Sequence, residues 1–313
     1  MSTCQSLVNA KPAMPLIRAA MTLGVLLIVS GCGQRDAATP PVDTPTTAST
    51  APSTAQAPAT DPADAKSPSA TTAISLKCEE SALTDAGQFI AENNVWGKQG
   101  VADWMQCMGA AALAHVSGQP AAMRAHWKWD WKHQGDNVKA FPEIVFGHKP
   151  GFPKSSTTLL PRKLSSLQTL NLSYDVTTER EGAGNLSIDM WLTSNNNPTT
   201  FAVPPITHEV MIWLEAYGPM YQGGELVDHA RINGTLYRVH VGEKFGLGWR
   251  YVAFAPNSPM QTTATVNLLP FFEYLRGKGY LTTDEHLSAV NLGNEIISGN
   301  GETKVNRLAV QVN

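Results

Sequence analysis

Residues 208–214 read His208-Glu209-Val210-Met211-Ile212-Trp213-Leu214, and residues 187–192 read Ser187-Ile188-Asp189-Met190-Trp191-Leu192. If each stretch is a strand, successive side chains point to opposite faces. Each strand then has one purely apolar face. On its other face an acid lies beside an indole, Glu209 with Trp213 and Asp189 with Trp191. Two such strands predict a sheet that buries one face in a core and carries carboxylates among aromatic rings on the other.

The rest of residues 74–313 also predicts a β-rich domain. Short alternating runs are separated by Gly, Asn and Pro, a pattern typical of a β-sandwich or barrel. Further runs of this kind cover residues 170–176, 235–241, 249–254 and 304–312. One stretch has helical spacing instead, and its apolar positions are Leu268, Leu269, Phe272 and Leu275. With Pro270 in its first turn and Gly277 at its end, it predicts one short helix.

The amino-terminal residues 1–31 have the layout of an export signal. Lys11 and Arg18 precede an apolar run over residues 19–29, and small residues follow it directly before Cys32. The layout resembles a bacterial lipoprotein signal, so we expect Cys32 to receive lipid and to anchor the protein in the cell envelope. Because Gly33 rather than Asp follows the cysteine, the resemblance favours the outer membrane. Ordinary signal cleavage, with Cys32 as an incidental thiol, is the alternative.

Residues 32–73 predict a disordered tether. They are almost all Ala, Thr, Pro, Ser and Asp, with hardly any large apolar side chain to bury. Such a segment cannot offset the entropy of ordering its backbone, and frequent Pro extends it. We therefore divide the chain into signal, tether and a folded domain over residues 74–313.

Composition argues against several classes of function. The formal net charge is −3, and the Lys and Arg residues are scattered, so we expect no nucleic-acid partner. The eight His residues include no pair at a ligand-like spacing, so we expect no metal site. No glycine loop has the context of a phosphate site, so we expect no cofactor. The eight Trp and seven Tyr suit a sugar-binding cleft, although aromatic rings also fill cores.

Two further features lie in the first half of the domain. Residues 126–131 place Trp127, Trp129 and Trp131 on one face of a strand, and whether these rings line a cleft or the core stays open. Cys78 and Cys107 are the two cysteines outside the signal and the lipid site. In an exported protein such a pair predicts a disulfide, with two free buried thiols as the alternative.

Three segments resemble glycoside hydrolase family 12. The run Glu209-Val210-Met211-Ile212-Trp213-Leu214 resembles the family's nucleophile strand, Gly293-Asn294-Glu295-Ile296-Ile297-Ser298-Gly299 its acid/base segment, and Asn93-Asn94-Val95-Trp96-Gly97 its first-strand motif. The two cysteines and residues 271–275 fall where the family has its disulfide and its helix. The resemblance spans residues 78–313.

This resemblance implies a fold and an activity. The fold is an all-β jelly-roll sandwich of two antiparallel sheets with an open cleft and one helix. The activity is that of a retaining endo-β-1,4-glucanase, with Glu209 as nucleophile, Glu295 as acid/base and Asp189 as a third acid that hydrogen-bonds the nucleophile. The two glutamates would then lie roughly 5–5.5 Å apart. The substrate-binding residues implied by the resemblance are Trp96, Asn94, Met211 and Trp213.

Departures from the family pattern limit what can be expected of the substrate. Ile296 and Ile297 stand where the family often has Pro-Phe, and residues 217–224 do not follow its usual glycine spacing, so we expect a reshaped loop beside the cleft. Cellulose, mixed-linkage glucan and xyloglucan, all plant-type β-glucans, remain candidates. The lack of a separate binding module favours a soluble or branched glucan over crystalline cellulose. We also expect a monomer. A non-catalytic glucan-binding lipoprotein on the same fold is the alternative.

Overall fold

A computed structural model describes residues 73–132, 135, 137–243 and 248–313. The predicted signal, the lipid site at Cys32 and nearly all of the predicted tether lie outside these residues. Within the described part of the chain, no helix is both long and apolar enough to cross a bilayer.

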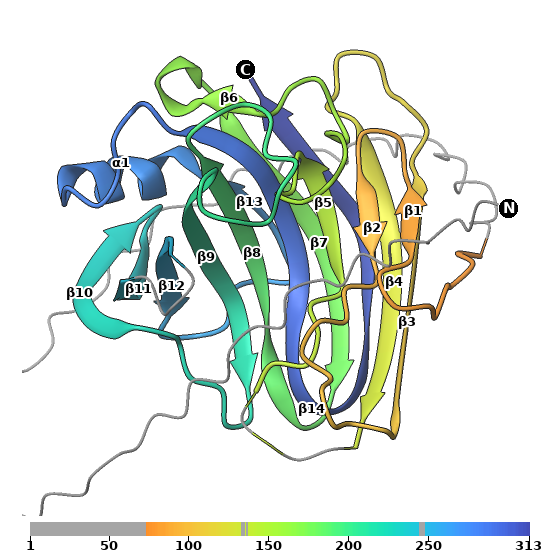
Figure 1. Cartoon of the computed structure of the whole chain (residues 1–313). Helices are drawn as coiled ribbons and strands as arrows, with labels where there is room; N and C mark the ends of the chain where they lie inside the picture. Colours follow the sequence, from red (N-terminus) through yellow and green to blue (C-terminus); the bar gives the residue numbers. More distant parts are fainter. Residues whose placement is uncertain (1–72, 133–134, 136, 244–247) are drawn as a thin grey trace, which may run out of the picture. The chain divides into compact units, whose positions relative to one another are not determined.

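Strands dominate the domain, as the alternating runs predict (Figure 1). The strands are β1 (Leu83–Asp85), β2 (Ile90–Glu92), β3 (Trp104–Ala112), β4 (Ala122–Trp131), β5 (Glu143–Gly147), β6 (Arg162–Lys163), β7 (Leu170–Arg180), β8 (Ala183–Thr193), β9 (Ile206–Tyr217), β10 (Glu225–Ile232), β11 (Thr235–Glu243), β12 (Arg250–Pro256), β13 (Thr263–Asn267) and β14 (His286–Val312). A 3-10 turn, η1, covers Leu164–Ser166, and the α-helix α1 covers Leu269–Gly277.

The strands form two sheets that share β14. The larger sheet has the order β1-β2-β5-β14-β8-β9-β12-β11-β10, with β6 also paired to β14. The smaller sheet has the order β3-β4-β14-β7-β13. The expected two-layer sandwich is therefore confirmed. Its pairs are antiparallel except for β9 and β12, which run parallel in the described structure.

Strand β14 passes from one sheet to the other at two glycines. Its first half pairs with β5 and β8, and from Gly299 onward it pairs with β4 and β7. Gly299 has a φ of +89°, and a Cβ there would lie 2.2 Å from the carbonyl oxygen of Glu181. At Gly301 a Cβ would lie 2.5 Å from the carbonyl oxygen of Glu179. The crossing needs glycine because no side chain fits between the adjacent backbones.

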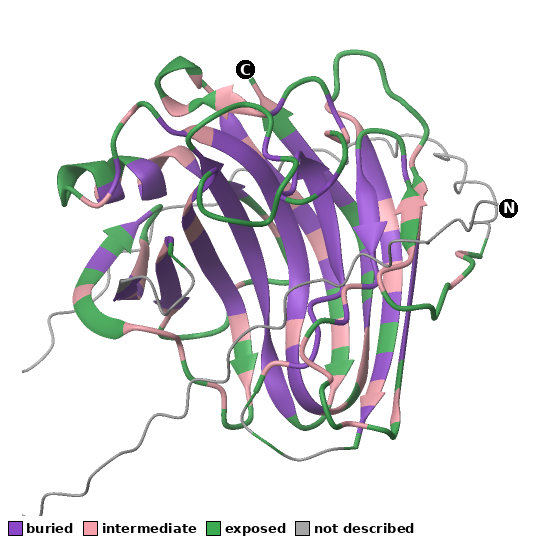
Figure 2. Cartoon of the chain, in the orientation of Figure 1, coloured by how far each residue is buried: buried purple, intermediate pink, exposed green. Residues whose placement is uncertain are grey.

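The core lies between the sheets, and Figure 2 shows buried residues along the central strands and exposed ones in many connecting loops. Trp127, Trp129 and Trp131 are all in this core, which answers the question that the sequence left open. The indole of Trp127 donates to Oδ1 of Asn294 at 2.9 Å. These rings therefore fill the sandwich and do not line a cleft.

The predicted helix and the predicted disulfide are both present. Helix α1 has Pro270 in its first turn, and it buries Phe271, Phe272 and Leu275 against the core. Cys78 and Cys107 are joined by a disulfide, which ties the chain before β1 to strand β3.

Candidate active site

The three predicted acids lie on the face of the larger sheet that points away from the core. We call this the acid face and define it by Asp189 on β8, Glu209 on β9 and Glu295 on β14. The alternate residues of β8 and β9, including Ile188 and Ile212, belong to the core between the sheets. The strand register places Asp189 of β8 opposite Asn291 of β14 and opposite Met211 of β9. The three strands that carry the acids are therefore neighbours in the sheet. The alternation predicted from the sequence is thus the alternation observed.

Glu209 is held by the indole of a residue that comes just before the neighbouring parallel strand. Nε1 of Trp249, just before β12, donates to Oε2 of Glu209 at 2.9 Å. Burial raises the pKa of Glu209 to about 7, the Trp249 hydrogen bond opposes this rise, and the charge on Glu143 adds to it. The carboxyl therefore titrates near neutral pH, where ordinary glutamates are fully ionised.

Glu295 is held in a similar way by an amide. Its cross-strand partner on β8 is Asn185, which is fully buried. Nδ2 of Asn185 donates to Oε2 of Glu295, and the backbone N–H of Glu295 donates to Oδ1 of Asn185 at 3.2 Å. Burial raises the pKa of Glu295 to about 7; the Asn185 hydrogen bond lowers it, and the charge on Glu209 raises it. The two glutamates are therefore electrostatically coupled.

Asp189 is the most deeply buried of the three acids, with 3% of its surface exposed. Burial raises its pKa well above the usual range, and the charge on Glu209 is the next largest cause. Its Oδ1 atom is buried and has no hydrogen-bond partner among the described residues. A carboxyl in such a place favours its protonated form, since the protonated form carries no charge and can donate a hydrogen bond.

Met211 and Trp213 pack beside these acids on the same face. They form a small apolar cluster with Tyr251 and Ala253 of β12, separate from the main core. The hydroxyl of Tyr251 donates to Sδ of Met211 at 3.3 Å. Trp213 therefore belongs to the acid face, as the alternation predicts, although its ring is almost fully covered.

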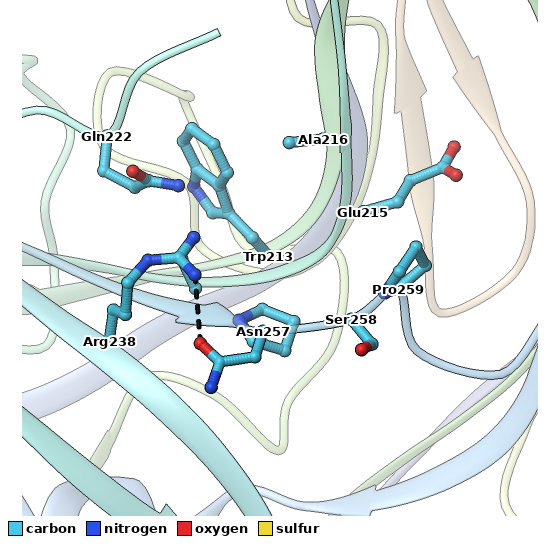
Figure 3. Close-up of a pocket in the computed structure, with 10 residues that line it drawn as sticks. Trp213, Glu215, Ala216, Gln222, Arg238, Asn257, Ser258 and Pro259 are labelled. Carbon is cyan, nitrogen blue, oxygen red and sulfur yellow. Dashed lines mark hydrogen bonds between the residues drawn. The ribbon is translucent and has the colours of Figure 1, made fainter. Parts of the chain in front are cut away.

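A cavity of about 180 Å³ adjoins Trp213 (Figure 3). Polar side chains line much of it, among them Glu215, Gln222 and Arg238, and Arg238 donates to Oδ1 of Asn257 at 3.0 Å. Gln222 belongs to the segment 217–224, whose departure from the family pattern predicts a reshaped loop. This loop therefore contributes to the wall of the cavity beside Trp213.

The motif over residues 93–97 contains two predicted binding residues, which differ in how far they are exposed. Trp96 has 47% of its surface exposed, which is unusual for so large an apolar ring and leaves its surface available to a ligand. Asn94 is half-buried, and its Nδ2 donates to Oε1 of Glu143 at 2.9 Å. The Nδ2 group of Asn94 is thus already used in a hydrogen bond within the protein.

Sequence reasoning missed several residues that contact the acids or act on them electrostatically. Trp249 and Tyr251 alternate with the core residue Val252, the same signal that identified Glu209, so the pattern could have placed them on the acid face. Nothing local marks Asn185, because its role depends on the register of β8 against β14. Nor does any pattern mark the buried Glu143 and Lys149, whose ion pair spans the turn after β5.

Comparisons with known proteins show the family of this chain. The family model described as Glycosyl hydrolase family 12 matches residues 87–313. The chain belongs to glycosyl hydrolase family 12. Family 12 sandwiches are jelly rolls, and the two sheets and single helix of the described residues match that fold.

Three relatives illustrate the range of the family. Endoglucanase S of Pectobacterium parmentieri is 26% identical over 223 residues, covering 70% of this chain and 80% of its own. The inactive glycoside hydrolase XLP1 of Phytophthora nicotianae is 26% identical over 245 residues, covering 75% and 91%. The solved family 12 xyloglucanase of Bacillus licheniformis superposes with a TM-score of 0.65 at 25% identity, covering 76% of this chain and all of its own.

Proposed function

We propose that this family 12 protein is a retaining endo-β-1,4-glucanase that hydrolyses internal bonds of soluble β-glucan, with xyloglucan among its substrates. The observation that carries the proposal is the gathering of Glu209, Glu295 and Asp189 on one face, where burial raises all three pKa values. Coupled carboxyls with raised pKa values are typical of glycosidase sites.

In this mechanism Glu209 and Glu295 share one proton at the working pH. Glu209, ionised, attacks the anomeric carbon, while the proton on Glu295 passes to the leaving glycosidic oxygen. The glycosyl–oxygen bond breaks as the ester to Glu209 forms. Glu295, now ionised, takes a proton from water, and the resulting hydroxide displaces Glu209.

The two hydrogen-bond donors suit these roles. Trp249 stabilises the ionised form of Glu209 through its N–H, and a carboxylate so held needs little reorganisation before it attacks. Asn185 occupies Oε2 of Glu295, which leaves Oε1 to carry the transferable proton. Asp189, kept protonated by burial, adds no second negative charge beside the nucleophile.

The choice of soluble glucan has two supports. The relatives include an endoglucanase and a xyloglucanase. The exposed ring of Trp96 offers a flat platform for a sugar face, and the polar cavity beside Trp213 offers hydroxyl partners on the same sheet.

A non-catalytic glucan-binding role is the second candidate, and the inactive relative from Phytophthora favours it. A binding protein would be free to lose any of the acids, whereas this chain keeps all three. The two candidates differ in what happens to a glucan once it is bound, so they are separated by measuring binding and hydrolysis in the same preparation.

The decisive experiment compares the wild type with E209Q on xyloglucan, mixed-linkage glucan and carboxymethyl cellulose. We expect E209Q to lower reducing-sugar release by at least about 1,000-fold, because the amide cannot act as the nucleophile. The matched control is E273Q, a substitution at an exposed position of α1. The anomer that appears first, followed by NMR, tests retention.

Two outcomes would overturn parts of the proposal. Unchanged sugar release by E209Q would remove Glu209 from the nucleophile role. A wild-type protein that retards in glucan-containing gels but releases no sugar from any of the three polymers would favour the binding role.

A further inference from the structure

A buried ion cluster lies beside the acid face and consists of Glu143, Lys149 and Glu92. Nζ of Lys149 lies 2.5 Å from Oε1 of Glu143 and 2.5 Å from Oε2 of Glu92. Glu143 has 1% of its surface exposed and Lys149 has 7%. Burying three charged groups is costly, and ion clusters of this kind rarely improve stability over apolar packing. The cluster therefore calls for a functional explanation.

Glu143 bridges two amides that belong to different parts of the site. Its Oε1 accepts from Nδ2 of Asn94 at 2.9 Å, and its Oε2 accepts from Nδ2 of Asn291 at 2.7 Å. An ionised carboxylate can only accept hydrogen bonds, so it fixes which end of each amide faces it. The Oδ1 atom of Asn94 is therefore left to accept from another group, such as a sugar hydroxyl.

Asn291 continues the bridge to Asp189. The two residues are directly opposite each other on β14 and β8. Their Oδ1 atoms are both buried, and neither has a hydrogen-bond partner among the described residues. Two buried acceptors on facing residues are satisfied together if a proton resides on Asp189. Because Nδ2 of Asn291 donates to Glu143, the Oδ1 atom of Asn291 is the end of this amide that is left without a partner among the described residues.

Electrostatics link the same groups. The charge on Glu143 raises the pKa of Glu209 and also that of Asp189, whereas Lys149 lowers the latter. Burial raises the pKa of Glu143 itself to about 7, with the Lys149 ammonium opposing the rise and Glu92 adding to it. The Lys149 ammonium and the two amide donors favour the ionised form of Glu143, which is the form that accepts from both amides.

Four charged or titratable groups interact with Glu143 in the described structure. They are Glu92 on β2, Lys149 after β5, Asp189 on β8 and Glu209 on β9.

We propose that Glu143, anchored by Lys149, is a positioning residue that couples Asn94 on the substrate side to the acids Asp189 and Glu209 through Asn291. The inference rests on the proposed glycosidase function and extends it. Glu143 touches neither substrate nor the reacting atoms. It sets the orientation of the Asn94 amide on the substrate side and of the Asn291 amide opposite the buried acid, and its charge acts on the nucleophile in addition to burial.

The test is E143Q in the full-length protein, assayed as kcat and KM on xyloglucan across pH. Glutamine keeps the size of the side chain but removes its charge, and it can accept from only one of the two amides through its single oxygen. We expect the acidic limb of kcat/KM to move to lower pH by about 0.5 unit, because a like charge near Glu209 is lost. We also expect KM to rise roughly 3- to 10-fold, because Asn94 loses a hydrogen bond.

E92Q is the matched control. It makes the same substitution on the other partner of Lys149, but Glu92 contacts neither amide of the bridge and does not contribute to the raised pKa of Glu209. We expect its acidic limb to move less than that of E143Q, because Glu92 acts on Glu209 only through Glu143. If E143Q does not fold, E143Q/K149M removes the ion pair as a unit and is expected to move the limb in the same direction.

The outcomes separate this inference from the proposed function. An active wild type whose acidic limb and KM are unchanged by E143Q, or shifted equally by E92Q, would overturn the positioning role and leave the glucanase assignment intact. A wild type without activity would overturn the assignment. In that case the inference is tested by the pH titration of Trp249 fluorescence, obtained by subtracting the W249F protein, because the Trp249 indole contacts Glu209. A titration midpoint unmoved by E143Q would then refute it.

Discussion

Glu209 and Glu295 lie in closely matched surroundings, since each is half-buried, each accepts one hydrogen bond from a neighbouring side chain and each has a pKa raised to about 7. Burial is the largest cause in both, and it favours the neutral form. The donors oppose it. The indole of Trp249 therefore lowers the pKa of Glu209 and keeps this carboxyl ionised at a lower pH than burial alone would allow.

The first prediction concerns this indole. W249F removes the N–H that donates to Glu209, so the pKa of Glu209 should rise and the acidic limb of kcat/KM should move to higher pH by about 0.5–1 unit. The measurement is the pH profile on xyloglucan. The matched control is W191F, because Trp191 packs against Trp249 with ring centroids 5.8 Å apart but donates no hydrogen bond to an acid in the described structure. Equal shifts in both variants would show that packing, and not the hydrogen bond, sets the pKa.

At the scale of elements, β14 determines how the site is assembled. Its first half carries Glu295 and Asn291 in the larger sheet, and its second half closes the smaller sheet against β4 and β7. Both halves depend on the crossing at Gly299, where the backbone adopts a positive φ and lies against another strand end. A backbone distortion at Gly299 would therefore disturb both the acid face and the core.

The second prediction uses this glycine. G299A should destabilise the domain by about 3 kcal/mol or more in urea unfolding, because the new Cβ would meet the Glu181 carbonyl oxygen at 2.2 Å and φ is +89°. The control is G100A, where φ is +78° but nothing lies within 4 Å of the Cβ position. G100A carries the cost of backbone conformation alone, about 1 kcal/mol. Equal losses in the two variants would contradict the role of close approach.

At the scale of the whole molecule, the carboxyls of the acid face and of the adjacent ion cluster cost stability at neutral pH. Burial raises the pKa values of Glu143, Glu209 and Glu295 from about 4.5 to about 7. Between these values the folded state binds more protons than the unfolded chain, so the contribution of these groups to the unfolding free energy falls as pH rises. Their stabilising contribution is complete below about pH 4.5 and is lost by about pH 7.

The third prediction follows from this fall in the unfolding free energy as pH rises. E295Q should leave the unfolding free energy nearly unchanged at pH 4.5 and raise it by roughly 1–3 kcal/mol at pH 8, because the amide never has to ionise in a buried place. Urea unfolding at the two pH values is the measurement. E273Q on the exposed side of α1 is the control and should show no such difference. A loss of stability in E295Q at pH 8 would contradict the account.

The local patterns in the sequence determined much of this protein. Alternation placed Glu209 and Asp189 on one face and their neighbours in the core, and helical spacing with Pro270 located α1. These features could be read because side-chain direction follows from the backbone period within a few residues. Motif resemblance added Glu295 and Trp96, which no periodicity distinguishes.

Only the tertiary structure decided the rest. Trp127, Trp129 and Trp131 alternate as a cleft strand would, yet they fill the core, because β4 joins the smaller sheet with that face inward. The bridge from Asn94 through Glu143 to Asn291 joins three segments far apart in the chain. Such contacts depend on which strands pair and in which register. That choice is made by the packing of the whole domain, and no local stretch of sequence contains it.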